Sequence, residues 1–432
     1  MNASTGTMTV RQAAFIGVGA MVGAGIFALL GTAGAVAGAA VWLSFAIAGA
    51  IAGLQGYSFA KLGARFPSGG GLLEYVKRGF GDGYVTGVTC WLVYAANIVI
   101  TGLVAVSFGS YASSLLLGED AGEVWTKVFA AVVLLAMLWL NVVGSQAVAR
   151  VQTVIVWIVV GILLTFAVVT ILNMDPSLLD PSGYPPARDI VSSVALTFFA
   201  FLGFGVITFT AKDLAEPGKQ LPRAMYLALA IATVTYIAVA LGVFGTLTVD
   251  EVIESGGTAI AVAAEPTLGR FGYWLMSVTG LFATAGATNA GIYPAGGLSI
   301  ELASTGQYPP VMGRSIGRVP VGTLVMVVAT LVLAIGFNLD AIASIGSAVA
   351  LLIFSMVTLG HLRIRGETGA NPIVLVVGLL ATTIALVVFA TTTLVEEPAA
   401  VTALLVIVAL SIGLDLWWKR TRGRPAPVTG TT

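Results

Sequence analysis

Two glycines interrupt the first long apolar stretch of the chain. Gly23 and Gly25 flank Ala24 within residues 21–27, and each makes a helix interior about 1 kcal/mol less stable than an alanine would. In a lipid bilayer, a backbone group that leaves the helix has no water with which to bond. We therefore predict that the helix breaks between Val22 and Ile26, and that its freed amide and carbonyl groups form a binding site.

The same spacing returns in the second half of the chain. The run Leu202-Gly203-Phe204-Gly205-Val206 repeats the apolar–Gly–x–Gly–apolar pattern, again in the middle of an apolar stretch. The first copy lies in the first predicted span and the second in the sixth, so the two copies cross the membrane in opposite directions. Paired glycine-interrupted spans in corresponding halves indicate the binding site of an inverted-repeat transporter.

Two broken helices offer complementary groups to one ligand. Half-helix N-termini present positive dipole ends and N–H groups that suit a carboxylate, while half-helix C-termini and unwound carbonyls suit an ammonium. One pair can therefore hold both ends of a zwitterion without a charged side chain. The alternative interpretation is that such glycines only permit close helix packing, as the pairs Gly19/Gly23 and Gly49/Gly53 would.

The bulk composition places these stretches in a membrane. Of 432 residues, 58% are hydrophobic and 9% are charged, whereas soluble proteins carry about 25% charged residues. Apolar runs near the ~20 residues that a span requires fall at 10–36, 41–61, 84–117, 125–143, 151–173, 189–211, 222–247, 268–299, 320–337, 340–361, 371–394 and 398–418. We predict an all-α polytopic membrane protein with 12 transmembrane helices; an eleven-span alternative would merge the runs on either side of Leu339 into one overlong helix.

Basic residues concentrate in every second predicted loop. With the N-terminus inside, the inner loops and tail hold Lys61, Arg65, Lys77, Arg78, Arg150, Lys212, Lys219, Arg223, Arg314, Arg318, Arg363, Arg365, Lys419, Arg420, Arg422 and Arg424. Only Lys127, Arg188 and Arg270 fall outside, where the loops are acidic. The positive-inside rule therefore predicts a multi-pass protein of the cell membrane with N- and C-termini in the cytoplasm and a basic tail at 419–432.

No ionisable residue lies deep within a predicted span. Asp340 and Asp415 lie at span ends, and His361 lies at an inner span end, where we expect an interfacial residue rather than a titrating switch. A charge in mid-membrane costs from ~3 kcal/mol upward, so this pattern suits a pocket that handles charge with backbone dipoles. It disfavours a polyamine, whose ammonium groups would need carboxylates.

Aromatic residues surround the second glycine pair. Phe198, Phe199, Phe201 and Phe204 favour a neutral or apolar amino acid as substrate, although at least half of them are expected to be core or lipid contacts. Alternate helix positions cannot all face one pocket.

Several other classes of protein do not fit the sequence. The lone cysteine, Cys90, excludes a disulfide framework and a cysteine metal cluster, and Gly17-x-Gly19-x-x-x-Gly23 has the wrong spacing for a dinucleotide loop. The 20 basic and 20 acidic residues balance, so charge gives no indication of a nucleic-acid partner. We predict no cofactor, no metal and no enzymatic activity. A passive channel is the less favoured alternative, because a channel usually shows a selectivity ring or a symmetric oligomer.

Two inner loops are more than turns. Residues 67–71 are rich in glycine and lead into residues 72–78, an amphipathic segment expected to lie at the membrane interface. Residues 215–223 form a polar turn with two prolines. Each loop fits a membrane-surface role and a gating role about equally well.

The motifs resemble a known family. Gly23 to Phe27 with Gly31 resemble the first broken helix of amino acid permeases in the amino acid–polyamine–organocation (APC) superfamily. Residues 199–204, followed by Glu216-Pro217 and residues 221–224, resemble its sixth span and the loop behind it. Further matching motifs lie at residues 67–81 and 289–320, so the resemblance covers roughly residues 10–365 in the right order.

The resemblance implies a LeuT-like fold and alternating access for an amino acid. It implies one transporter domain over residues 1–432, with inverted repeats of five spans at 10–173 and 188–362 and two peripheral helices at 371–418. It also implies a monomer or homodimer whose partners are the amino acid, the lipid bilayer and, in some relatives, a coupling proton.

The resemblance also implies a set of binding residues. The carboxylate would meet the amides of Ala24, Gly25 and Ile26, and the ammonium would meet carbonyls of both breaks. Phe199 would be an aromatic gate, and Asn97, with Tyr94 one turn before it, would line the side-chain pocket. The implied substrate-binding residues are Met21, Val22, Gly23, Ala24, Gly25, Ile26, Tyr94, Asn97, Phe199, Ala200, Leu202 and Gly203.

The chain departs from the family where relatives couple transport to an ion. A carboxylate found in many relatives corresponds to Gly205, a lysine of some proton-coupled relatives to Val159, and hydroxyls of sodium-coupled relatives to Gly286-Ala287. The coupling ion stays open between proton, sodium and none. An amino acid exchanger and a polyamine, organocation or other amine permease stay open as alternatives.

Overall fold

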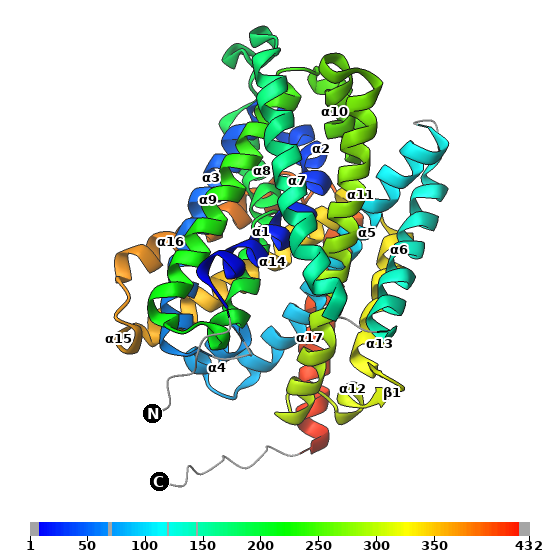
Figure 1. Ribbon diagram of the computed structural model, residues 1–432. Coiled ribbons are helices and arrows are strands. Elements are labelled where there is room, and N and C mark those ends of the chain that lie inside the picture. Colours follow the sequence, from blue (N-terminus) through cyan, green and yellow to red (C-terminus); the bar gives the residue numbers. More distant parts are fainter. Residues whose placement is uncertain (1–7, 68–70, 119–120, 144–145, 423–432) are drawn as a thin grey trace.

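The computed structural model describes residues 8–67, 71–118, 121–143 and 146–422, and these residues are almost entirely helical (Figure 1). Within this part, nine helical segments are long and apolar enough to cross a membrane, and two shorter apolar helices accompany them. The length and composition of these helices make the chain a polytopic helical membrane protein. Some predicted features lie outside the described residues: the tail from residue 423 with Arg424, residues 68–70 of the glycine-rich loop, and the side chains of Arg150 and Lys212.

The helices of the first half begin and end at identifiable signals. They are α1 (Val10–Ala24), α2 (Ile26–Ala37), α3 (Val41–Arg65), α4 (Leu72–Phe80), α5 (Tyr84–Leu117), α6 (Glu123–Val143) and α7 (Gln146–Leu172), with the 3-10 turn η1 (Gly38–Ala40) before α3. The Thr9 hydroxyl accepts the Gln12 amide and caps α1. α2 ends at Gly38, whose φ of 54° is strained for any residue with a side chain.

The second half contains a long 3-10 helix among its α-helices. Its helices are α8 (Ala187–Phe199), η4 (Leu202–Asp213), α9 (Pro217–Phe244), α10 (Val249–Ser255), α11 (Ala259–Ser304), α12 (Pro310–Gly313), α13 (Val321–Gly336), α14 (Leu339–Arg363), α15 (Arg365–Thr368), α16 (Pro372–Thr391) and α17 (Pro398–Arg422). Short 3-10 turns are η2 (Pro176–Leu179), η3 (Pro181–Gly183) and η5 (Gly256–Thr258). The strand β1 (Ser315–Ile316) pairs antiparallel with β2 (Val319–Pro320).

Each predicted apolar segment coincides with a described helix or helix pair, with shifted boundaries. The segment 10–36 becomes α1 and α2, and 189–211 becomes α8 and η4. α9 begins before the predicted residue 222, at Pro217, because proline at the first helical position lacks only an amide that has no intrahelical partner. α11 extends before residue 268 and is interrupted at Gly269, where φ is 64°.

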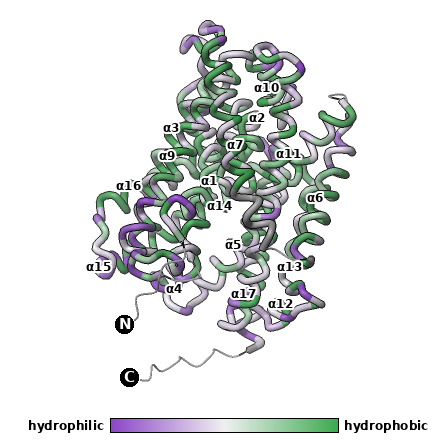
Figure 2. Tube along the Cα trace, viewed as in Figure 1, coloured by the Kyte–Doolittle hydropathy of each residue, from purple (hydrophilic) through white to green (hydrophobic). Residues whose placement is uncertain are grey.

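Charged loops gather at the ends of the molecule. In Figure 1, α4, α12 and α15 lie at one end together with the C-terminal end of α17, and α10 lies at the other end. Figure 2 shows hydrophilic residues around α4, α12 and α15, whereas the helices between the ends are mostly hydrophobic. The loops that the sequence assigns to one side of the membrane therefore lie together.

One face of α4 packs against the rest of the protein. Leu73, Tyr75 and Val76 are buried, and the Tyr75 ring contacts the Phe59 ring of α3 edge to face at 6.0 Å. A Cβ at Gly79 would lie 2.6 Å from the Gly360 Cα of α14. α4 is thus a packed element that joins α3 to the end of α14, since only its other face reaches solvent.

Candidate substrate site at two broken helices

The first break lies at a single residue. Gly25 separates α1 from α2 with φ −91° and ψ −84°, its amide donates to the Met21 carbonyl at 2.7 Å, and its carbonyl accepts from Leu29 at 2.9 Å. A Cβ at Gly25 would overlap the Tyr236 hydroxyl and lie 2.9 Å from the Ala200 Cβ. The predicted break is confirmed, and glycine is needed there because neighbouring atoms leave no room for a side chain.

The second break begins earlier than its glycine pair. α8 ends at Phe199 and η4 begins at Leu202, with Ala200 and Phe201 between them. The predicted break at 202–206 is therefore displaced, and Gly205 lies inside η4 with no heavy atom within 4 Å of a Cβ placed on it. A 3-10 helix of this length is uncommon and often marks a hinge or strain.

Aromatic packing explains where α8 ends. The Phe198 ring contacts Phe354 of α14 edge to face at 5.5 Å, whereas the Phe201 ring contacts Tyr236 of α9 at 5.1 Å. Two side chains three positions apart are thus held by different helices. Phe198, Phe201 and Phe204 are wholly buried, which confirms the expectation that at least half of the phenylalanines are core contacts.

Tyr236 of α9 connects the two breaks. Its hydroxyl donates to the Ala200 carbonyl at 3.1 Å and lies where a side chain on Gly25 would have to go. Its ring packs between Phe45 and Phe201, at 5.4 and 5.1 Å. The sequence reasoning missed this residue. The available signal was a tyrosine in the middle of an apolar span, because a buried phenol hydroxyl usually requires a partner.

Other glycines serve close packing rather than a break. A Cβ at Gly203 would lie 2.5 Å from the Met21 amide nitrogen, so this glycine lets η4 approach α1. A Cβ at Gly23 would lie 2.5 Å from the Ala283 carbonyl oxygen of α11. Gly49 meets Thr233 in the same manner, whereas Gly53 faces open space. The interpretation as a helix break therefore holds for Gly25, and the interpretation as close packing holds for Gly23, Gly49 and Gly203.

The predicted backbone ligands are partly engaged with one another. The Gly25 amide, expected to meet a carboxylate, donates to Met21, and the Ala200 carbonyl, expected to meet an ammonium, accepts from Tyr236. A carbonyl oxygen has two lone pairs and can accept a second donor. The Gly25 amide, in contrast, has one hydrogen, which it donates to Met21, so its contact with a carboxylate stays a prediction.

The predicted gate and pocket residues contact different helices. Phe199 is 3% exposed, and its ring occupies the place that a side chain on Gly346 of α14 would take. The Tyr94 hydroxyl donates to the Gly322 carbonyl of α13, and Asn97 donates to the Gly291 carbonyl of α11 at 3.0 Å. These two polar groups therefore bond to α11 and α13, and their contact with substrate stays a prediction.

Both half-helices of the first span are tied at their far ends. Toward the α10 end, the Thr32 hydroxyl of α2 donates to Asp340 of α14 at 2.7 Å. Toward the α4 end, the Met8 amide before α1 donates to the Asp213 carbonyl of η4 at 3.1 Å. Gly25 thus lies, along the chain, between these two contacts.

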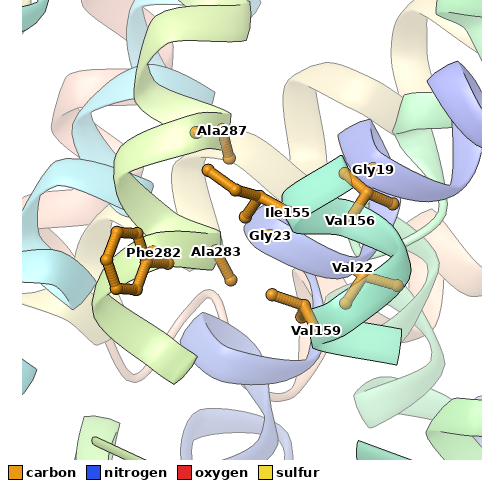
Figure 3. Close-up of a pocket in the computed structure, with 10 residues that line it drawn as sticks. Gly19, Val22, Gly23, Ile155, Val156, Val159, Phe282, Ala283 and Ala287 are labelled. Atoms are coloured by element: carbon orange, nitrogen blue, oxygen red, sulfur yellow. The ribbon is translucent and has the colours of Figure 1, made fainter. Parts of the chain in front are cut away.

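A small apolar cavity lies beside the first break, between α1, α7 and α11 (Figure 3). It is partly open, holds about 20 Å³ of accessible space, and is lined by Gly19, Val22, Gly23, Ile155, Val156, Val159, Phe282, Ala283, Gly286 and Ala287. The positions that correspond to coupling groups in relatives, Val159 and Gly286-Ala287, meet here.

The lining of this apolar cavity does not fit a cation. None of its side chains carries oxygen or nitrogen, and Thr284 and Thr288 are not among its lining residues. A hard cation takes about six oxygen ligands. The side chains of this cavity also include no titratable group that could carry a proton.

His361 is a structural residue rather than an interfacial one. Its side chain is buried, and its two ring nitrogens lie 2.8 Å from the Ser58 and Thr368 hydroxyls. The expectation of an interfacial imidazole is wrong, because α3 and α15 cover the inner end of α14. With both nitrogens bonded, His361 joins these elements.

Comparison with known proteins places the chain among transporters. A family model described as "Amino acid permease" matches residues 8–414. The inner membrane transport protein YbaT of Escherichia coli is 31% identical over 376 residues, 87% of each chain. The serine/threonine exchanger SteT of Bacillus subtilis is 25% identical over 59% of this chain and 58% of its own. The methylthioribose transporter of the same species is 26% identical over 56% and 55%, respectively.

Proposed function

The chain belongs to the amino acid permease family of the APC superfamily, and from that premise we propose that it is a secondary active transporter of neutral amino acids. The observation that carries the proposal is the meeting of both helix breaks at Tyr236, whose hydroxyl bonds Ala200 beside Gly25. Broken spans that converge at one point supply backbone groups of both signs to a single ligand.

The proposed binding mode assigns each end of the amino acid to one kind of backbone group. The carboxylate binds at the N-terminus of α2, where the first helical amides from Ile26 onward lack intrahelical partners. The ammonium binds at the C-terminus of α8, where the Phe199 and Ala200 carbonyls end the helix. Because neither break has a carboxylate side chain, a polyamine or other multiply charged cation is the weaker candidate.

The proposed transport cycle alternates between the two ends. Release of the Thr32–Asp340 contact would open the site toward the α10 end, and release of Met8 from Asp213 would open it toward the α4 end. We place the α4 end in the cytoplasm because the basic loops gather there. The proposal includes twelve spans in a LeuT-like arrangement of five plus five with two peripheral helices, and cytoplasmic termini.

The proposed driving force is the amino acid gradient itself. The side chains that line the apolar cavity beside Gly23 supply neither an oxygen ligand for sodium nor a titratable group for a proton. The similarity to a protein named a serine/threonine exchanger supports the same assignment. The substrate on the far side would then return the carrier by exchange.

Counterflow in proteoliposomes tests this proposal. Vesicles that contain the purified protein are loaded with one unlabelled neutral amino acid, and uptake of the labelled form is followed with and without imposed sodium or proton gradients. We expect internal substrate to stimulate uptake several-fold and either ion gradient to leave it unchanged. Uptake that requires an ion gradient would contradict the exchange mode, and no uptake of any amino acid would contradict the substrate class.

A further inference from the structure

A second cavity lies at the α4 end of the molecule, between α4, the start of α5 and the end of α11. It is partly open to the surface and holds about 60 Å³ of accessible space, and its polar lining includes Glu74 and Lys77 of α4, Thr86 of α5, Glu301 of α11 and Gln307. Leucines from α4 and α11 form the apolar part of its wall. Accessible space of this size holds a few water-sized groups, at about 10–15 Å³ for each, and so suits a very small molecule.

One buried acceptor of this polar cavity lacks a partner in the described structure, and an exposed carboxylate lies beside it. The Gln307 Oε1 atom is buried and has no hydrogen-bond partner there. Burying a polar atom without a partner costs about 1–3 kcal/mol, which a ligand that donates a hydrogen bond would recover. Glu301 forms no ion pair with any described residue.

The charges around the polar cavity leave an excess of one negative group. Glu74 pairs with Arg78 at 2.8 Å, and Lys77 pairs with Asp82 at 3.1 Å, so these four charges compensate one another. The carboxylate of Glu301 is left over. An exposed carboxylate without an ion-pair partner in the described structure, beside a buried acceptor, suits a singly charged donor.

We propose that this cavity binds the ammonium group of a small primary amine that carries an apolar body. The ammonium donates to Glu301 and to Gln307 Oε1, which come from the end of α11 and the loop that follows it. The apolar body lies against Leu73, Leu298 and Leu302. An ammonium has three donors, so the free lone pairs of Glu74 can accept the third.

The polar cavity is separate from the broken helices. Along α11, Glu301 lies 14 residues beyond Ala287, which lines the cavity beside the first break. At a rise of 1.5 Å per residue, this spacing corresponds to about 21 Å. A ligand in the polar cavity therefore does not share contacts with one at Gly25.

A ligand in the polar cavity would connect α4 to α11. α4 packs on α14 at Gly79 and Gly360, and the Arg363 guanidinium lies 4.5 Å from the Phe80 ring centroid. α14 also carries Gly346 beneath Phe199, so a ligand that connects α4 to α11 restrains the helix against which the predicted gate packs. This consequence for transport rests on the proposed function, whereas the binding itself does not.

Titration of the purified full-length protein tests the inference. The probe is n-butylammonium chloride at neutral pH, measured by calorimetry, and n-butanol is the uncharged control with the same apolar body. We expect saturable binding of n-butylammonium, at least tenfold weaker in Glu301→Gln and in Gln307→Met, and no saturable binding of n-butanol. Glu301 is on the surface of α11, so its substitution tests the charge without loss of the fold.

A variant at the first break distinguishes the two sites. Gly25→Ala should bind n-butylammonium within twofold of the wild type, even where amino acid uptake is lost. Unchanged affinity in Glu301→Gln, or loss of amine binding in Gly25→Ala, would overturn the inference. If the proposed function failed, no amino acid would exchange in proteoliposomes, yet n-butylammonium would still bind through Glu301.

Discussion

The two interrupted spans share a glycine pattern but break in different ways. In the first, two α-helices meet at Gly25, where Tyr236 and Ala200 leave no room for a side chain. In the second, an α-helix passes into a 3-10 helix at Ala200 and Phe201, while Gly205 faces open space. The first break is imposed by close contact, and the second by aromatic side chains that pack on different helices.

This difference assigns different mechanical roles to the two spans. A change in direction at one residue lets α1 and α2 move as separate rigid pieces. In contrast, η4 spreads its irregularity over 12 residues, and the poorer hydrogen-bond geometry of a 3-10 helix makes rearrangement less costly. We therefore expect the first break to tolerate no added atom, and the second to tolerate changes at Gly205.

The largest effect is expected from Gly25→Ala. The added methyl would overlap Tyr236 Oη and lie 2.7 Å from the Met21 carbonyl oxygen, and overpacking of this kind costs about 1–3 kcal/mol. Substrate affinity should fall by about 10- to 100-fold, since about 1.4 kcal/mol corresponds to a factor of ten. Titration of the purified variant measures it, and wild-type affinity would contradict the contact-imposed break.

A smaller loss, mainly of stability, is expected from Gly203→Ala. Its methyl would meet backbone atoms of Ala20 and Met21 at 2.5 Å, and backbone cannot rotate away as a side chain can. Separation of α1 from η4 should lower the unfolding free energy by about 1–3 kcal/mol. Thermal unfolding in detergent checks this, with Gly205→Ala as the matched control in the same helix.

Tyr236→Phe should lower substrate affinity moderately on its own, and it should restore part of the affinity that Gly25→Ala loses. Alone, it removes a hydrogen bond worth about 0.5–1.5 kcal/mol and leaves the Ala200 carbonyl without that donor. In the double variant with Gly25→Ala, it removes the oxygen that the new methyl would meet. Part of the lost affinity should return, and strictly additive losses would show that Tyr236 does not constrain the first break.

The smallest effect is expected from Gly205→Ala. A Cβ there has no heavy atom within 4 Å, and alanine is favoured over glycine in helices by up to about 1 kcal/mol. Uptake should match the wild type, and the melting temperature should stay equal or rise slightly. A loss of uptake comparable to that of Gly25→Ala would contradict the claim that Gly205, unlike Gly25, tolerates a side chain.

Much of the helical layout follows from local sequence. The apolar stretches predict where helices lie because a bilayer requires about 20 apolar residues per span. Gly25 could be identified as a break because its cost in a helix is a local property. The hydrogen bond from the Gly25 amide to the Met21 carbonyl could not be predicted, since it depends on how far the two half-helices separate.

Features that depend on contacts between distant segments escaped the sequence. Tyr236 bonds a carbonyl 36 residues away, and no periodicity in α9 indicates that partner. His361 is buried because Ser58 and Thr368 come from other elements, although Arg363 beside it suggests an exposed position. The end of α8 at Phe199 likewise depends on Phe354 and Tyr236, which lie on two other helices.

The central claim is that the two breaks bind a zwitterion through backbone groups, and competition for uptake tests it most directly. Labelled neutral amino acid is transported into proteoliposomes in the presence of the free amino acid, its carboxamide or its N-acetyl derivative. The account predicts that only the free amino acid competes, and that Gly25→Ala, but not Gly205→Ala, weakens this competition. Equal competition by either blocked derivative would contradict it.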